Sequence, residues 1–417
     1  MISTSTPNIY NRSLIAVSIA IFSVIIGYGL FIPFLPYYAN ILGATLGLQV
    51  GLMTSSFMLT NAIGAAPLGR FSDRFGRKLI ISIGLFTYAI STLIFPFVST
   101  WIHLVILRAI QGIGGAMIWP ASRALIADIT PSGSRGRALG FFNACFMLGL
   151  VIGPAVGGAI QFYGYEILNL SELESYKLPF YFGGVFSAIA SIIAIKFIDE
   201  PGKPSFSPNS INSEKETGFI GLKKRFHTTF KLLLALRFSN GFALSFIQPL
   251  LAFYIHDVIG LERTDAVFWL ASSFFISGLI AAIIQIPSGK LADERDRKSI
   301  IIVAILVSQI FTILIPLSKG VLLIVILVGL RSAASSFYRP SLESFEADLF
   351  PQRNRGKLTG ITQTASNIGS VMGPLFGFLL YDFVDVRYPF YFSAMIFIIS
   401  AIAFTLFAKN PVVDDEY

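Results

Sequence analysis

Long apolar segments constrain this chain more than any other feature. There are twelve of them, at residues 14–38, 47–69, 79–98, 103–127, 138–160, 178–197, 229–254, 266–288, 299–318, 321–347, 358–381 and 388–408. A helix of about 20 apolar residues crosses the hydrocarbon layer of a bilayer, which is about 30 Å thick. Backbone groups in that layer must be satisfied by the protein itself, and no stretch alternates like a membrane β-strand. The sequence therefore predicts an all-α membrane protein with twelve transmembrane helices.

The composition excludes several other classes of protein. Only 13% of the 417 residues are charged, whereas a soluble protein carries about 25%. The single cysteine, Cys145, excludes a disulfide within the chain, and no His, Cys, Asp or Glu residues cluster at ligand spacing, so we predict no metal site. The sequence has no nucleophile–base pair and no phosphate-binding loop, which argues against an enzyme and predicts no cofactor.

Lysine and arginine are shared unevenly between alternate loops. Basic residues gather in the loops at 70–78, 135–137, 223–225, 290–298 and 353–357, whereas the loops between them hold only Lys177, Arg263, Lys319 and Arg387. Positive loops favour the cytoplasmic side, so we expect a multi-pass protein of the plasma (inner) membrane with both termini in the cytoplasm. The net charge of +8 then reflects topology, and we predict no nucleic-acid partner.

Two charged loops repeat one pattern. Residues 69–78 (GRFSDRFGRK) and 289–298 (GKLADERDRK) share Gly, Asp, Arg and Lys at equivalent positions, 220 residues apart, and the same offset relates Gly153 to Gly373. Two halves of the same orientation imply a pseudo-twofold axis along the membrane normal, which suits alternating access around a central cavity. We predict a six-helix bundle at 1–198, a cytoplasmic linker at 199–227 and a second six-helix bundle at 228–417.

The first loop carries charges that need partners at the membrane boundary. Its candidate latch residues, with those that follow the segment at 103–127, are Gly69, Asp73, Arg74, Gly76, Arg77, Asp128 and Arg135. Arg77 and Asp128 are natural partners, with Arg135 or Arg137 as alternates. We predict a latch that joins the two halves when the cavity faces outward and breaks when it faces inward. The alternative is a topology signal with an ordinary surface ion pair, worth about 0–1 kcal/mol.

The second loop repeats this constellation with two departures. Asp293, Arg297 and Asp348 stand where the first copy has its aspartates and arginine, which favours the latch interpretation. However, Asp296 replaces the second glycine, Gly76, and Glu294 replaces Arg74. We therefore expect a weaker latch in the second half.

Three motifs give the chain a family resemblance. They are the loop at 69–78, the stretch at 108–115 (RAIQGIGG, with Arg108, Gln111 and Gly112) and the stretch at 149–158 (GLVIGPAVGG, with Gly149, Gly153, Pro154 and Gly157). With these motifs the chain resembles major facilitator superfamily transporters, and among them the twelve-helix drug:proton antiporters of the multidrug and tetracycline exporter type. The resemblance implies two pseudo-symmetric six-helix bundles, and the third motif is associated with exporters that work as antiporters.

The glycines of the third motif share one face of their helix. Gly149, Gly153 and Gly157 recur every four residues, so two helices can approach backbone to backbone along them. Pro154 favours a kink beside that face. Close packing alone explains these residues, and a face that bends and seals the cavity is a compatible reading.

Charges inside the apolar segments are candidates for function, because burying one at the bilayer centre costs about 2.5–3.5 kcal/mol. These residues are Arg108, Arg123, Arg237, Arg331, Arg339, Glu343 and Glu346. By the 220-residue offset Glu343 is the counterpart of Arg123, so a pair of the two is a candidate inner gate, with Arg237 as a competitor. Glu343 is our first candidate for proton exchange, against a gate pair that stays ionised. We expect Glu346 to lie nearer the surface.

The remaining cavity is predicted to be aromatic and weakly polar. In the resembled family the segments at 14–38, 103–127, 229–254 and 321–347 line the cavity. Candidate substrate contacts are Tyr28, Tyr37, Asn61, Asn143, Asn240, Gln248, Arg331, Gln363 and Asn367. Such a surface suits a lipophilic or amphiphilic solute held by stacking and a few hydrogen bonds.

The sequence thus predicts a secondary active transporter, a monomer that exports small hydrophobic or amphiphilic compounds in exchange for protons. Five arginines against two carboxylates in the membrane leave an alternative, a carrier for an anionic metabolite, sugar or lipid. The first six segments hold no carboxylate away from their ends. The proton site is therefore expected in the C-terminal half, unless Arg108 responds indirectly.

Overall fold

The computed structural model describes residues 11–131, 134–200, 226–294, 296–351 and 355–410. The N-terminal helices are α1 (Arg12–Phe31), α2 (Leu35–Ile41), α3 (Gly47–Phe75), α4 (Arg77–Ile94), η1 (Phe95–Phe97), α5 (Trp101–Ile129), α6 (Arg135–Phe162), η3 (Tyr163–Ile167) and α7 (Glu172–Phe197). The C-terminal helices are α8 (His227–Asp257), α9 (Arg263–Glu294), α10 (Arg297–Leu314), η6 (Ile315–Leu317), α11 (Val321–Leu349), α12 (Arg355–Phe383) and α13 (Tyr388–Phe407).

Each predicted apolar segment is occupied mainly by one long helix among the described residues. Nine of the described helices are long and apolar enough to span a membrane alone. The two arms of α8, His227–Ser245 and Pro249–Asp257, meet at 43° and make a tenth span if taken together. The other two long helices, α3 and α12, carry more Gly, Ser, Thr and Asn, which lowers their mean hydropathy. The first segment differs from the prediction, because α1 ends before Pro33 and the chain resumes as α2 with Pro36 in its first turn.

The chain divides into two compact units. Unit 1 comprises residues 1–43 and 56–206, and unit 2 comprises residues 44–55 and 207–417. Unit 2 therefore includes the start of α3, where Asp382 accepts hydrogen bonds from the backbone N–H groups of Gly47 and Leu48 at 3.0 and 2.8 Å. Most of the predicted linker, residues 201–225, lies outside the described residues, so the linker at 199–227 stays a prediction.

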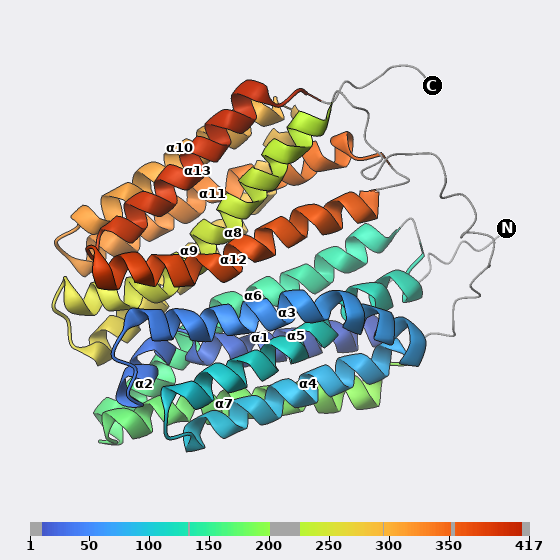
Figure 1. Ribbon diagram of the computed structural model, residues 1–417. Coiled ribbons are helices and arrows are strands. Elements are labelled where there is room, and N and C mark those ends of the chain that lie inside the picture. Colours follow the sequence, from blue (N-terminus) through green and yellow to red (C-terminus); the bar gives the residue numbers. More distant parts are fainter. Residues whose placement is uncertain (1–10, 132–133, 201–225, 295, 352–354, 411–417) are drawn as a thin grey trace, which may run out of the picture. The chain divides into compact units, whose positions relative to one another are not determined.

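Helix packing repeats between the units. In unit 1, α1 packs against α6 and α7, and α4 packs against α5 and α7 (Figure 1). In unit 2, α8 packs against α12 and α13, and α10 packs against α11 and α13. These helices of unit 2 thus have the neighbours of their counterparts about 220 residues earlier, in agreement with two pseudo-symmetric six-helix bundles.

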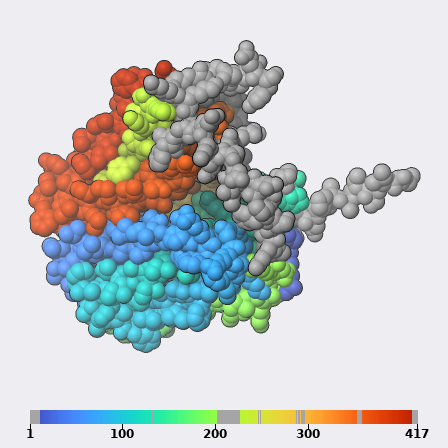
Figure 2. All heavy atoms as spheres, turned by 45° about the vertical axis from the view of Figure 1, so that its right-hand side comes forward, coloured from blue at the N-terminus to red at the C-terminus, as the bar shows by residue number. Residues whose placement is uncertain are grey.

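Apolar side chains lie on both the inside and the outside of each unit. In unit 1 a buried cluster centres on Leu14, Ile21, Leu125 and Phe142, and in unit 2 the buried cluster includes Phe345. Outward faces also carry large apolar residues, as α4 does with Phe86 at 57% exposure. The atoms of unit 1 that are in view in Figure 2 form a continuous surface. Apolar side chains on the outside are expected for helices that contact lipid.

Candidate functional site

The loop between α3 and α4 holds an arginine between two carboxylates. Arg77 Nη1 lies 2.5 Å from Asp73 Oδ1, and Arg77 Nε lies 3.1 Å from Asp128 Oδ2 at the end of α5. Arg77 also donates to the Ser72 hydroxyl at 2.9 Å. The structure therefore brings together the residues of the predicted Arg77–Asp128 pair. Arg135, the predicted alternate, donates instead to the backbone carbonyls of Ala127 and Thr130, at 3.1 and 3.4 Å.

The two glycines of this loop are used differently. Gly76 has a φ of +107°, a region that side chains disfavour, and a Cβ there would lie 2.9 Å from the Glu200 carboxylate carbon. Gly69 is helical, and a Cβ on it would make an ordinary contact with Pro120 at 3.7 Å. Of the two positions, only position 76 thus requires a glycine. Between them, Arg74 places its guanidinium 5.3 Å from the ring of Phe75.

Sequence reasoning did not find Glu200, which follows α7. Its Oε1 accepts a hydrogen bond from the Arg77 N–H at 2.7 Å, and its Oε2 accepts one from the Lys78 N–H at 2.8 Å. The first N–H groups of a helix have no partner within it, and a carboxylate there also meets the positive end of the helix dipole. Glu200 therefore fixes the start of α4 beside the latch residues. Only the fold brings it there, since 123 residues separate it from Arg77.

The second copy of the loop has its own ion pair. Arg297 at the start of α10 pairs with Asp348 at the end of α11, and its Nη1 donates to the Ser344 carbonyl at 3.3 Å. Asp296 accepts hydrogen bonds at its Oδ2 from the Ser299 hydroxyl at 2.6 Å and from the Ser299 N–H at 3.0 Å. The side chain of Asp293, also predicted here, lies outside the described residues.

The α5 motif forms a buried polar chain. Arg108, which is 2% exposed, donates to Gln111 Oε1 at 3.1 Å, and Gln111 Nε2 donates to the Thr92 hydroxyl at 2.9 Å. The Arg108 guanidinium lies over the ring of Phe57 at 4.5 Å and over that of Tyr28 at 5.5 Å. Aromatic faces attract such a cation. Arg108 is thus held by an amide and two rings, without a carboxylate among the described residues.

Glycines bring α5 close to its neighbours. A Cβ on Gly112 would overlap the Phe57 carbonyl and the Thr60 hydroxyl of α3. A Cβ on Gly114 would lie 2.9 Å from the Gly84 carbonyl oxygen of α4. Close packing therefore accounts for the small residues of this motif.

The α6 glycines face α1. A Cβ on Gly149 would lie 3.0 Å from α1, one on Gly153 would lie 2.8 Å from Gly29 Cα, and one on Gly157 would overlap the Leu30 carbonyl. A Cβ on Gly29 would in turn lie 2.8 Å from Pro154 Cδ. Backbone-to-backbone packing, as the spacing predicts, explains this motif.

Charged residues of α8 and α11 pair differently from the prediction. Arg237 donates to both carboxylate oxygens of Glu346, from Nε and Nη2, at 2.7 Å each. Glu346 is 5% exposed and is the only buried carboxylate among the described residues. It lies nearer the end of α11 than Glu343, and its depth in the membrane stays a prediction. Glu343 is exposed and lies 3.4 Å from Arg339, one turn away. The predicted gate pair of Arg123 and Glu343 joins residues of different units and stays a prediction.

The predicted cavity residues of unit 1 fall into two groups. Tyr28 stacks on Phe57 with ring centroids 5.9 Å apart, and Asn61 donates to a backbone carbonyl of α5 at 3.4 Å. Tyr37 is fully buried, whereas Asn143 is exposed. Tyr28 and Asn61 thus lie beside the Arg108 cluster, and Tyr37 is part of the packing.

The predicted cavity residues of unit 2 lie on α8, α11 and α12. Asn240 accepts a hydrogen bond from a tyrosine of α11, and Gln363 donates to Asn367 at 3.0 Å. The side chain of Gln248 lies outside the described residues. Arg331 is half-buried and makes no hydrogen bond or ion pair with any described residue.

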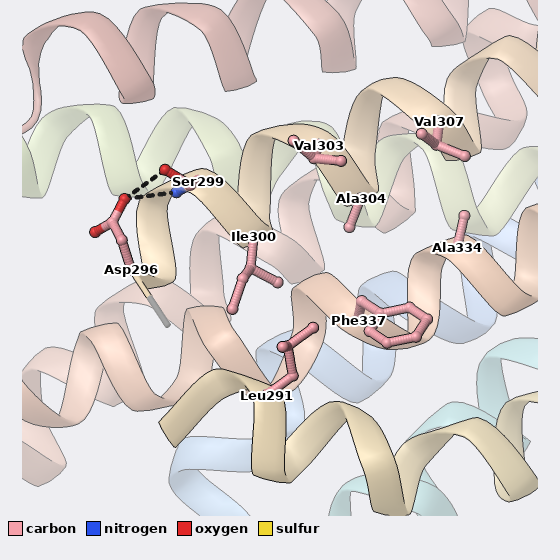
Figure 3. A pocket seen from close by; sticks show the side chains of 9 residues that line it. All are labelled: Leu291, Asp296, Ser299, Ile300, Val303, Ala304, Val307, Ala334 and Phe337. Atoms are coloured by element: carbon pink, nitrogen blue, oxygen red, sulfur yellow. Dashed lines mark hydrogen bonds between the residues drawn. The ribbon is translucent and has the colours of Figure 1, made fainter. Parts of the chain in front are cut away.

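A cavity of about 600 Å³ opens along α10 in unit 2. Figure 3 shows its lining, in which Ile300, Val303 and Val307 of α10 face Leu291 of α9 and Phe337 of α11. The only charged side chain drawn is Asp296, which lies at one end of the lining and accepts a hydrogen bond from the Ser299 hydroxyl. The lining of this cavity is therefore mainly apolar, unlike the charged clusters of the two loops and of α8 and α11.

Comparisons with known proteins agree along the whole chain. A sequence model of the Major Facilitator Superfamily matches residues 17–330 and 269–416. Multidrug resistance protein 1 of Bacillus subtilis (strain 168) is 29% identical over 393 residues, which cover 94% of this chain and 95% of that protein. Quinolone resistance protein NorA of Staphylococcus aureus (strain Mu50) is 27% identical over 389 residues, with coverage of 92% and 93%. A bacterial homologue of the human lysosomal transporter Spinster, solved inward-facing and occupied, has the same fold, with a TM-score of 0.77 at 17% identity and coverage of 94% and 95%.

Proposed function

Because the chain belongs to the Major Facilitator Superfamily, we propose that it exports small hydrophobic or amphiphilic compounds in exchange for protons, by alternating access. The family consists of transporters rather than enzymes, and the chain is a multi-pass membrane protein. Support for the substrate class comes from relatives of nearly the same length that are named for multidrug and quinolone resistance. Support for both termini in the cytoplasm comes from the basic loops.

The observation that carries the proton-coupling part is the buried pair of Arg237 and Glu346. A carboxylate in the membrane is costly unless it is paired or neutralised. Protonation of Glu346 would weaken both hydrogen bonds from Arg237 and release the guanidinium. A proton can therefore shift the equilibrium between two arrangements of α8 and α11. Coupling of proton movement to transport requires such a shift. Burial moves our choice of proton carrier from Glu343 to Glu346.

For the conformational part we propose that Arg77, Asp73 and Asp128 form the cytoplasmic latch. Its support is the geometry of one guanidinium between two carboxylates that belong to different helices. Exposed ion pairs of this kind are weak singly, at about 0–1 kcal/mol. A weak latch suits a transporter, since the closed and open states must be similar in free energy.

The proposal is tested in proteoliposomes with an imposed pH gradient. Norfloxacin and ethidium serve as probes, and we expect the liposomes to accumulate at least one of them when the lumen is acidic. Collapsing the gradient with nigericin should abolish the accumulation. Equal accumulation after nigericin would exclude proton exchange, and failure to move either probe would argue against the substrate class.

Two glutamine variants locate the coupling carboxylate. Glu346→Gln should retain exchange of labelled for unlabelled probe without a gradient but lose the response to pH. Glu343→Gln, which changes the exposed carboxylate one turn away, should respond normally. The opposite pattern would assign coupling to Glu343.

A further inference from the structure

Arg331 is a membrane arginine that its own chain leaves unpaired. It lies near the middle of α11, is half-buried, and makes no hydrogen bond or ion pair with any described residue. Its Nε is buried without an acceptor. The residue as a whole nevertheless keeps partial exposure.

The nearby acidic residues do not balance this charge. The three carboxylates of α11 are all engaged, Glu343 by Arg339, Glu346 by Arg237 and Asp348 by Arg297. Every other acidic residue of the helices in unit 2 stands within three residues of a helix end. An unpaired charge at that depth is costly, and intramembrane arginines usually pair or line a ligand path. The counter-charge of Arg331 is therefore expected to come from outside the chain.

The repeat allows Arg331 to be compared with the buried arginine of unit 1. By the 220-residue offset, Arg331 stands at the position of Gln111, the residue that satisfies Arg108 in unit 1. Arg108 is 2% exposed, bound to Gln111 and covered by two aromatic rings. Although its Nε also lacks an acceptor, Arg108 is sealed from ligands. The arginine of unit 2 has neither the amide partner nor a ring over it among the described residues.

The surroundings of Arg331 suit an aromatic acid. Tyr338 is seven residues further along α11, so the two side chains leave the helix within about 20° of one another. The Tyr338 hydroxyl donates to Asn240 of α8, and its ring meets the edge of Phe397 at 5.7 Å between centroids. A buried aromatic side chain and an amide thus lie about two turns further along the helix face that carries Arg331.

We propose that Arg331 binds the acidic group, a carboxylate or a sulfonate, of an amphiphilic organic acid that this transporter carries. A guanidinium recognises such a group by two parallel hydrogen bonds as well as by charge. Lipophilic cations lack a matching group, since the one buried carboxylate among the described residues is held by Arg237. The inference deepens the proposed export function and rests on it for the transport step, but binding can be tested alone.

The experiment measures equilibrium binding of three matched fluorophores to the full-length protein in nanodiscs of zwitterionic lipid, without a pH gradient. The probes are 1-pyrenebutyric acid, its methyl ester and 1-pyrenebutylamine, which share one aromatic body and differ in charge. We expect the acid to bind about tenfold more tightly than the ester or the amine. Arg331→Gln should reduce the affinity for the acid to that for the ester, and Arg331→Lys should keep part of the preference.

A matched control and a lipid arm complete the design. Arg387→Gln removes an exposed arginine at the start of α13 and should leave the preference intact. Equal binding of acid and ester by the wild type, or a preference that survives Arg331→Gln, would overturn the proposal. Loss of acid binding in nanodiscs of anionic lipid would assign the site to a lipid headgroup and would also overturn it. A preserved preference in a protein that fails the pH-gradient assay would instead count against proton-coupled export.

Discussion

Glu200 holds the start of α4 through the backbone of Arg77, whose N–H donates to Glu200 Oε1 at 2.7 Å. The equivalent helix of unit 2, α10, has no glycine before it, and Asp296 caps it from within the loop. Asp296 has a φ of −58°, an ordinary value for any residue. The first turn of α4 is thus capped by a carboxylate from a distant segment, Glu200, and the first turn of α10 by the local carboxylate of Asp296.

Replacing Gly76 by alanine should destabilise the protein by about 1–3 kcal/mol. The alanine would have to adopt a positive φ, and its Cβ would crowd the Glu200 carboxylate. The measurement is the midpoint of thermal unfolding in detergent. Gly136→Ala is the control, since Gly136 lies in the first turn of α6 and a Cβ added there would have no neighbour within 4 Å among the described residues. An equal effect of the two changes would show that the cap is not the cause.

Asp296 should give unit 2 a pH-dependent stability. Hydrogen bonds from the hydroxyl and the backbone N–H of Ser299 hold the pKa of Asp296 below its usual value of 3.8. A lowered pKa in the folded state means that the ionised cap stabilises at neutral pH, and that this contribution is lost as the pH falls through the lowered pKa.

Asp296→Asn tests this, because asparagine keeps the cap but cannot ionise. We expect the variant to be less stable by about 0.3–1 kcal/mol at pH 7, through the lost charge at the helix terminus. The difference in melting temperature between the two proteins should close as the pH falls through the lowered pKa of Asp296. A difference that stays constant or grows in acid would contradict the assignment.

Much of the fold followed from the sequence because the membrane leaves few choices. Each apolar segment had to become a helix, and the 220-residue repeat required the packing of α1 with α6 and α7 to recur around α8. The break between α1 and α2 was harder to place. Pro33 and Pro36 were visible, but a proline in a membrane helix can produce either a kink or an end.

The candidate site was predictable only where partners come from adjacent loops. Arg77 begins α4 and Asp128 lies near the end of α5, in loops that the sequence predicts on one side of the membrane, so their pairing could be expected. Glu343 and Glu346 share one stripe of α11, and choosing between them requires the rotation of α11 against α8, which no local pattern gives. For Glu200 the chain offered no signal, because its partners lie more than 120 residues away.

The pair of Arg237 and Glu346 should behave as a coupled unit. Their side chains are 13% and 7% exposed, so removing either one leaves a buried charge without a partner. Arg237→Met or Glu346→Met alone should cost about 3–5 kcal/mol, whereas the double variant should cost much less than the sum. A double-mutant cycle on the free energy of unfolding measures this coupling.

The exposed pair of Arg339 and Glu343 is the matched control for that cycle. Its side chains are 60% and 57% exposed, so the same cycle should give about 0–1 kcal/mol. Similar coupling energies for the two pairs would refute the distinction between a buried and an exposed pair, and with it the choice of Glu346.

Gly157 should be the least replaceable glycine of the α6 motif. A Cβ there would overlap the carbonyl oxygen and the Cα of Leu30, and backbone atoms of α1 cannot rotate away as a flexible side chain can. Gly157→Ala should therefore separate α6 from α1 and destabilise unit 1 by about 1–3 kcal/mol. Gly140→Ala, in the same helix but with no described atom within 4 Å of its Cβ position, should be neutral or slightly stabilising, since alanine favours helix. Thermal unfolding of both variants beside the wild type separates close packing from helix propensity, because propensity predicts a gain at both positions and packing predicts a loss at Gly157 alone.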